Sequence, residues 1–231
     1  EKRLAQEEMN LSGSHNVSEA DNMSHLIVHE LLAKLSWTPP APQAAASQAA
    51  PQDLSGYYQV MEEISRLLSS RGAAIFNIPD INLDGILGSM LEAAKAKELL
   101  PAEHVESVKA SILAREKEFP DAIGDTFNVL VGTHECFSEG GPALVFCTLA
   151  RPANFDAPDG MPTRFFWLLL GPPAMAREMV TLGEGTALLM SDARFHDEAV
   201  DLASPAALVQ LVSDTAAELR AALEAAVDGD S

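Results

Sequence analysis

The sequence is poor in basic residues and in cysteine, and it has no long hydrophobic run. Lysine and arginine number 15 against 34 aspartates and glutamates, so the formal net charge is −19. Such a charge repels phosphate backbones and anionic membrane surfaces, and we therefore expect no nucleic-acid partner. The longest apolar run ends at Gly171, short of the roughly 18–20 residues that cross a bilayer. The sequence favours basic peptides or basic protein faces as partners, although acidity also serves solubility alone.

The two cysteines, Cys136 and Cys147, both stand in apolar surroundings on or beside expected strands. Free cysteines in such places usually behave as small core residues in a reducing compartment. They therefore indicate neither a disulfide nor a metal pair. The first eight residues also lack the apolar core of a secretory signal.

The residues that are present favour an α/β fold. Residues 165–170 form a run of six apolar side chains without alternation, which indicates a strand that is covered on both faces. Apolar residues at helical spacing follow, from Met179 to Met190, and supply one cover. We therefore expect a central mixed β-sheet with helices on both faces.

The other elements interleave in the same way. Expected helices cover about 57–70, 83–97, 101–115 and a last segment from Ser204, and expected strands cover 73–78, 127–131 and 143–149. Before them, Asp21 can cap a short amphipathic helix, and residues 38–53 form a linker rich in proline, alanine and glutamine. The predicted organisation is an N-terminal extension over 1–56 and one domain over 57–231.

Several segments carry a family resemblance. The string P-T-R-F-F-W-L-L-L-G-P-P at 162–173, the string L-G-E-G-T-A-L-L-M-S-D-A-R-F-H-D at 182–197, and the shorter segments from Ser69, Leu99 and Val129 stand in one order. Together they resemble the cytoplasmic N-terminal domain of band 3 anion exchangers and sodium-bicarbonate cotransporters. The resemblance runs from about Tyr57 to about Val212.

This resemblance implies a fold similar to the mannitol and fructose type enzyme IIA phosphocarriers. It also implies a regulatory, protein-binding domain of a bicarbonate/chloride transporter at the cytoplasmic face of a membrane. The implied partners are the membrane domain of the same transporter and cytoplasmic proteins. A free-standing interaction subunit with the same fold remains an alternative.

His134 carries the alternative from another class, an enzyme IIA-like phosphocarrier. Those carriers phosphorylate a histidine at a strand end and hold the phosphate with a second histidine. Here Gly132 and Thr133 precede His134, and the helix expected to end at Met190 has no histidine. Glu135 adds negative charge, whereas a phosphoryl site needs positive or dipolar donors. We therefore expect a surface-loop histidine.

No other motif predicts an enzyme, a metal or a cofactor. His25 and His29 stand four apart on the expected N-terminal helix, but two ligands do not make a zinc site. His104 and His196 are isolated in the sequence. The pair Gly183-x-Gly185 does not complete a phosphate loop, and no G-x-S-x-G occurs.

Arg164 and the last helix supply the structural and interface predictions. Arg164 adjoins the buried strand, so we expect a partly buried guanidinium in an ion pair with a carboxylate. Leu219 and Leu223 extend an apolar stripe that fits either packing on the sheet or a helix–helix homodimer. The L-P-P segment with which the family's dimerisation arm begins is absent after them.

Overall fold

A computed structural model describes residues 55–118, 122–124, 126–157 and 159–229. The chain divides by its contacts into two units, Glu1–Pro40 and Ala41–Ser231, and every described residue belongs to the second. The expected N-terminal helix, His25, His29 and the linker lie outside the described residues, so the boundary near residue 56 stays a prediction. Within the described ranges, no helix has both the length and the apolar character to cross a bilayer.

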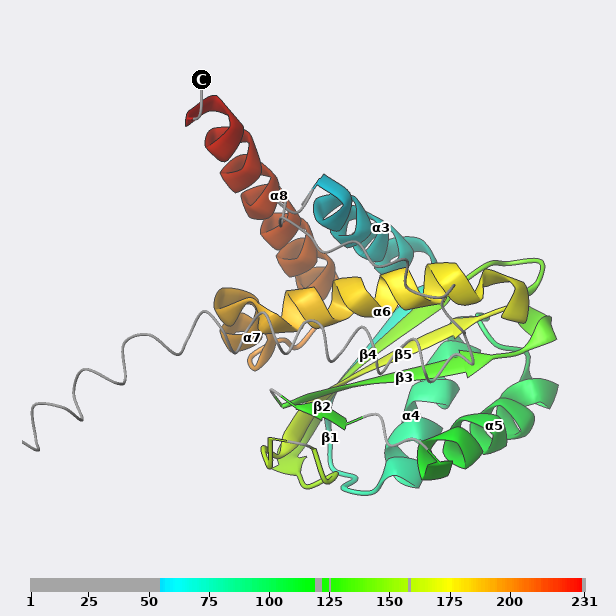
Figure 1. The fold of residues 1–231 in the computed structure, drawn as a ribbon. Coiled ribbons are helices and arrows are strands. Elements are labelled where there is room, and N and C mark those ends of the chain that lie inside the picture. Colours follow the sequence, from blue (N-terminus) through cyan, green and yellow to red (C-terminus); the bar gives the residue numbers. More distant parts are fainter. Residues whose placement is uncertain (1–54, 119–121, 125, 158, 230–231) are drawn as a thin grey trace, which may run out of the picture. The chain divides into compact units, whose positions relative to one another are not determined.

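Five strands form one mixed sheet in the order β1-β4-β5-β3-β2 (Figure 1). The strands are β1 (Gly72–Ile78), β2 (Ala122–Gly124), β3 (Phe127–Thr133), β4 (Ala143–Ala153) and β5 (Thr163–Gly171). The pairs β1–β4 and β3–β5 are parallel, whereas β4–β5 and β2–β3 are antiparallel. Consequently β3 and β5 end at the same edge of the sheet, and β1 and β4 end at the opposite edge.

Helices cover both faces of this sheet, which confirms the predicted fold class (Figure 1). One face packs against α4 (Leu83–Ala96) and α5 (Val105–Glu118). The other packs against α3 (Ser55–Arg71) and α6 (Ala176–Ser191), and α8 (Pro205–Gly229) lies along α3. A short α7 (Ala193–Ala199) joins α6 to α8.

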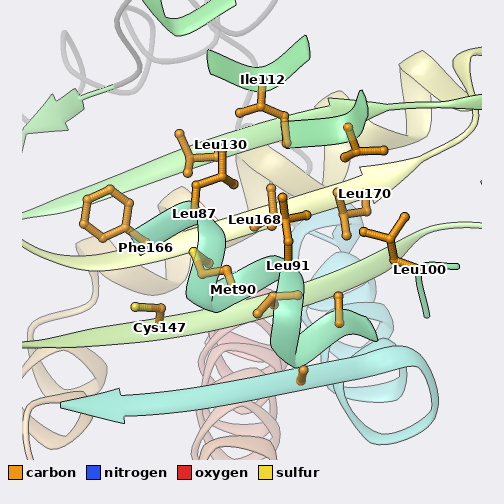
Figure 2. Packing of buried hydrophobic residues seen from close by; sticks show 14 of the residues in the cluster. Leu87, Met90, Leu91, Leu100, Ile112, Leu130, Cys147, Phe166, Leu168 and Leu170 are labelled. Atoms are coloured by element: carbon orange, nitrogen blue, oxygen red, sulfur yellow. The ribbon is translucent and has the colours of Figure 1, made fainter. Parts of the chain in front are cut away.

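The central strand β5 joins the two halves of the core. Because strand side chains alternate between faces, Phe166, Leu168 and Leu170 lie on the α4/α5 face, as Figure 2 shows, and their neighbours lie on the α3/α6 face. All six side chains from Phe165 to Leu170 are fully buried. Each buried side chain of this size contributes about 1.5–3 kcal/mol, so this run is the main anchor of the fold.

The observed elements match most of the expected ones within a few residues. The helix expected after Pro101 begins instead as a 3₁₀ turn, η1 (Ala102–His104), before α5. Four further elements of the described residues are short and were not predicted: β2, α7, and the 3₁₀ turns η2 (Glu135–Phe137) after β3 and η3 (Pro173–Met175) after β5. Both cysteines are free, as predicted, with Cys147 buried and Cys136 half-buried.

Candidate functional site

The edge where β3 and β5 end is the natural place to look for a site. In sheets with helices on both faces, ligands usually bind outside the carboxyl ends of the strands. Thr133 pairs with Gly171 at this edge, and the N–H of His134 donates a hydrogen bond of 3.1 Å to the Gly171 carbonyl. The fold therefore fixes His134 at the strand end, where its sequence position placed it.

The ring of His134 is engaged by its own turn. Its Nδ1 accepts a hydrogen bond of 3.1 Å from the N–H of Cys136 and so caps the η2 turn. A neutral imidazole whose Nδ1 accepts must carry its proton on Nε2, so this tautomer is assigned from the hydrogen bond. The Nε2 atom then has no free lone pair with which to attack a phosphoryl group.

His104 lies against His134, a contact that no pattern in the sequence indicates. The ring centroids are 4.7 Å apart and the ring planes are inclined by 44°. His104 ends the η1 turn, thirty positions earlier in the chain, and is half-buried. His104 is thus isolated in the sequence alone, because the fold brings its ring from η1 against that of His134.

The surroundings of the two rings disfavour nucleophilic chemistry. Burial raises the pKa of the Cys136 thiol, its backbone hydrogen bond lowers it, and the charge of Glu103 raises it further. Burial also raises the pKa of Cys147 to about 12. Both thiols are therefore protonated at neutral pH, and a thiol is a far weaker nucleophile than a thiolate. Among the described residues, no three histidine, cysteine or acidic side chains gather in a way that could hold a metal ion.

The arginine at this edge is held by backbone carbonyls. Arg71, the last residue of α3, donates from Nε to Pro142 at 3.1 Å and from Nη2 to Gly141 at 3.2 Å. A Cβ on Gly140 would lie 2.5 Å from the same Nη2, so the guanidinium packs directly against this glycine and would have to shift for a larger residue. Arg71 positions the turn before β4, a role for which the sequence offered only the Arg71-Gly72 turn as a signal.

Arg164 lies at the opposite edge, where β5 begins. Its backbone N–H donates to Thr126 at 2.6 Å, and its half-buried side chain has a buried Nε without a hydrogen-bond partner. On the neighbouring strand and the same face, Asn128 is 2% exposed and its Oδ1 also lacks a partner. No carboxylate of the described residues forms an ion pair with Arg164. The expected partial burial is present, but the expected ion pair is not seen in this part of the chain.

His196, also isolated in the sequence, supports the start of β3. Its Nε2 lies 2.7 Å from the Thr126 hydroxyl, and its ring meets Phe165 edge to face with centroids 5.2 Å apart. Thr126 has φ of +67°, which is unfavourable for a residue with a side chain. His196 thus helps to hold a strained turn.

Gly185, which was singled out in the sequence, belongs to helix packing. A Cβ on Gly185 would lie 2.4 Å from Val60 Cγ1, so α6 and α3 approach closely at this residue. Leu219 is half-buried on α8, whereas the side chain of Leu223 lies outside the described part. The helix–helix interface through these two leucines therefore stays a prediction.

Comparison with known proteins gives partial agreement with the resemblance. No family model matches the sequence. Anion exchange protein 2 from horse and from human are each 30% identical to the chain over 122 residues, which is 51% of this chain and 10% of the relative. The chain thus spans about a tenth of the length of these relatives. The match supports a link with anion exchangers over about half of the chain.

Solved structures define the fold independently. Nitrogen regulatory protein IIA-Ntr from Neisseria meningitidis superposes with a TM-score of 0.52 at 18% identity, covering 65% of this chain and 99% of that one. IIA mannitol from Escherichia coli gives a TM-score of 0.49 at 16% identity, covering 61% of this chain and 95% of that one. At such identities the first likeness shows the fold alone, and the fold is of the IIA type.

Proposed function

We propose that this domain is a regulatory and protein-binding domain of an anion exchanger-like membrane transporter and has no enzymatic activity. The observation that carries the proposal is the 30% identity with anion exchange protein 2 over 122 residues. The hydrogen bonds of His134 and Arg71 with the backbone, and the raised pKa that disfavours a thiolate at Cys136, support the absence of catalysis. The domain would lie at the cytoplasmic face, joined to a membrane domain that moves bicarbonate or chloride.

The reading frame that encodes this chain provides the first test. Continued beyond residue 231, it is expected to encode ten or more apolar segments of about 20 residues each, the length that spans a bilayer. A stop codon directly after residue 231 would instead favour a free-standing interaction subunit. Chloride–bicarbonate exchange by the full protein in vesicles, with and without residues 57–229, then measures the regulation. Identical exchange rates would contradict a regulatory role.

A phosphocarrier centred on His134 is the second candidate, because the contact with His104 supplies a second ring at the strand end. Phosphorylation at Nε2 would require this atom to lose its proton and Nδ1 to give up the Cys136 N–H, and both changes oppose the reaction. Incubation with phosphoenolpyruvate and the general phosphotransfer proteins separates the candidates. We expect no acid-labile phosphate, and its appearance in the wild type but not in His134→Ala would establish the phosphocarrier.

A further inference from the structure

An apolar groove lies between the end of α7 and the first turns of α8. Its volume is about 530 Å³, and its α8 wall consists of one helix face that includes Ala207, Leu211 and Asp214. The opposite wall is formed by Glu198 and by residues 201–203. From Ala207 to Asp214 the face extends about 10 Å along the helix, which is the length of about three residues of extended peptide.

The floor of the groove is apolar and firmly held. Leu202 and Leu211 line it and are only 8% and 5% exposed, so their positions are fixed by the core beneath them. Ala203 and Ala207 are exposed, and their small side chains leave the hollow open. A ligand can therefore place apolar atoms here without any rearrangement of the domain.

The rim of the groove is acidic. Glu198, Asp201 and Asp214 all line it, and no basic residue does. The nearest arginine, Arg194, donates from Nε to Glu198 at 2.8 Å and from Nη1 to Glu218.

This arginine is shared by too many carboxylates to neutralise them. The pKa of Arg194 is raised chiefly by its hydrogen bond to Glu198, and the charges of Asp214 and Asp192 also raise it. The Arg194 guanidinium thus interacts with four acidic side chains, those of Glu198, Glu218, Asp214 and Asp192. Asp201 at the rim is a fifth acidic side chain in this region. The surroundings of the groove remain negative.

From this combination of shape and charge, we infer that the groove binds a short basic segment of a protein partner, with lysine or arginine next to an apolar residue. The aliphatic stem of such a side chain covers the leucine floor, and its charged end reaches Asp201 or Asp214. Anionic membranes and nucleic acids are repelled by the same rim. The inference rests on the protein-binding part of the proposed function, but not on the link with a transporter.

The test uses the full chain and two labelled peptides. In one peptide lysines alternate with leucines, and in the other glutamines replace the lysines. Anisotropy titrations are expected to show binding of the lysine peptide only, weakened as salt is raised because the contacts lie near the surface. Amide NMR shifts caused by the peptide should concentrate at residues 198–214. Binding that both peptides share, or shifts centred elsewhere, would overturn the inference.

Matched variants separate the groove from the overall charge of the chain. Asp201→Asn with Asp214→Asn should weaken the lysine peptide by about five- to tenfold, whereas Glu92→Gln with Glu106→Gln changes the net charge equally and should alter affinity by less than about twofold. Ala207→Lys fills the hollow with a positive charge and should abolish binding without removing an acid. Equal losses of affinity in the two double variants would show that the peptide responds only to the net charge of −19, which would contradict the inference.

A second copy of the chain is the competing occupant. NMR shifts at 198–214 that depend on protein concentration without any peptide would identify self-association and overturn the proposal. The result is distinguishable from a failure of the proposed function, because the reading frame and the exchange measurements do not depend on this groove.

Discussion

The two edges of the sheet differ in how their polar groups are satisfied. Where β3 and β5 end, the Nδ1 of His134 and the guanidinium of Arg71 both have partners in the backbone. Where the same strands begin, the Nε of Arg164 and the Oδ1 of Asn128 are buried without one. At the edge where an α/β fold usually places chemistry, His134 and Arg71 thus serve structural contacts, although the buried Nε and Nη2 of Arg115 lack a partner beside Val131, two residues before the end of β3. The opposite edge has unmet hydrogen-bonding capacity at the strand ends themselves.

This difference bears on function. The Nδ1 of His134 accepts from a backbone N–H, Arg71 donates to two backbone carbonyls, and the raised pKa of the Cys136 thiol disfavours the thiolate, so each group has a structural role or a lowered reactivity. The edge at Arg164 carries the cost of unpaired polar groups, about 1–3 kcal/mol for each one. This contrast is one ground for the non-enzymatic, protein-binding role that we propose for the domain.

Removal of the common anchor should give the largest effect. Leu168→Ala empties a fully buried position on the α4/α5 face and should lower the free energy of unfolding by about 2–5 kcal/mol. Urea denaturation measures this loss, and NMR should show that both edges are perturbed. A loss below about 1 kcal/mol would mean that β5 is not the shared anchor.

Removal of the His134 side chain, whose Nδ1 has a hydrogen-bond partner, should give the next largest loss of stability. His134→Ala leaves the N–H of Cys136 without its acceptor and should cost about 1 kcal/mol of stability. His134→Asn keeps a side-chain oxygen for this N–H and serves as the control. If the two variants melt at the same temperature, the capping bond contributes nothing measurable.

Removal of the Arg164 guanidinium, whose buried Nε has no hydrogen-bond partner, should lower the stability by less. Breaking a buried ion pair costs about 3–5 kcal/mol, which would be the loss for Arg164→Ala if the ion pair expected from the sequence formed. Because no carboxylate of the described residues pairs with Arg164, we expect Arg164→Ala to lower the free energy of unfolding by less than about 1 kcal/mol. The lost packing of the aliphatic stem accounts for most of this change. Arg164→Met keeps the stem and should lie closer to the wild type. A measured loss of about 3 kcal/mol or more would reveal a paired carboxylate after all.

The smallest change in stability is expected for Glu184 on α6, a partly buried carboxylate. Burial raises its pKa above the ordinary value of 4.5, so the folded state favours the protonated acid. Its stabilising contribution is present in acid and is lost as the pH rises through the folded-state pKa. Glu184→Gln cannot ionise and should be more stable than the wild type by about 0.5 kcal/mol at neutral pH. The gain should vanish in acid, and a gain that persists there would exclude ionisation as its cause.

The long elements could be predicted because burial on both faces leaves a clear pattern. The run 165–170 and the stripe from Met179 to Met190 identified β5 and α6 without reference to other parts of the chain. The shortest elements could not be found in this way. The seven residues of α7 span too few turns for a periodic pattern, although Asp192 caps it with a hydrogen bond of 2.7 Å to the N–H of Phe195.

The sequence indicated where the candidate site lies, but not which contacts and hydrogen bonds its residues form. The sequence placed His134 at a strand end, yet the contact with His104 arises from tertiary packing between η1 and η2. The acidic groove likewise depends on how the chain turns between α7 and α8, although its charges are visible in the sequence. Contacts between distant segments decide which polar groups are engaged.

If the Nδ1 of His134 accepts from Cys136, its Nε2 has no free lone pair, so the tautomer of this ring decides whether it can act as a nucleophile at the end of β3. Long-range ¹H–¹⁵N NMR at about pH 8, where an unperturbed imidazole is neutral, reports which ring nitrogen carries the proton. We predict that the proton is on Nε2 and that Nδ1 accepts from the N–H of Cys136. A proton on Nδ1, which would leave the lone pair of Nε2 free beside His104, would contradict it.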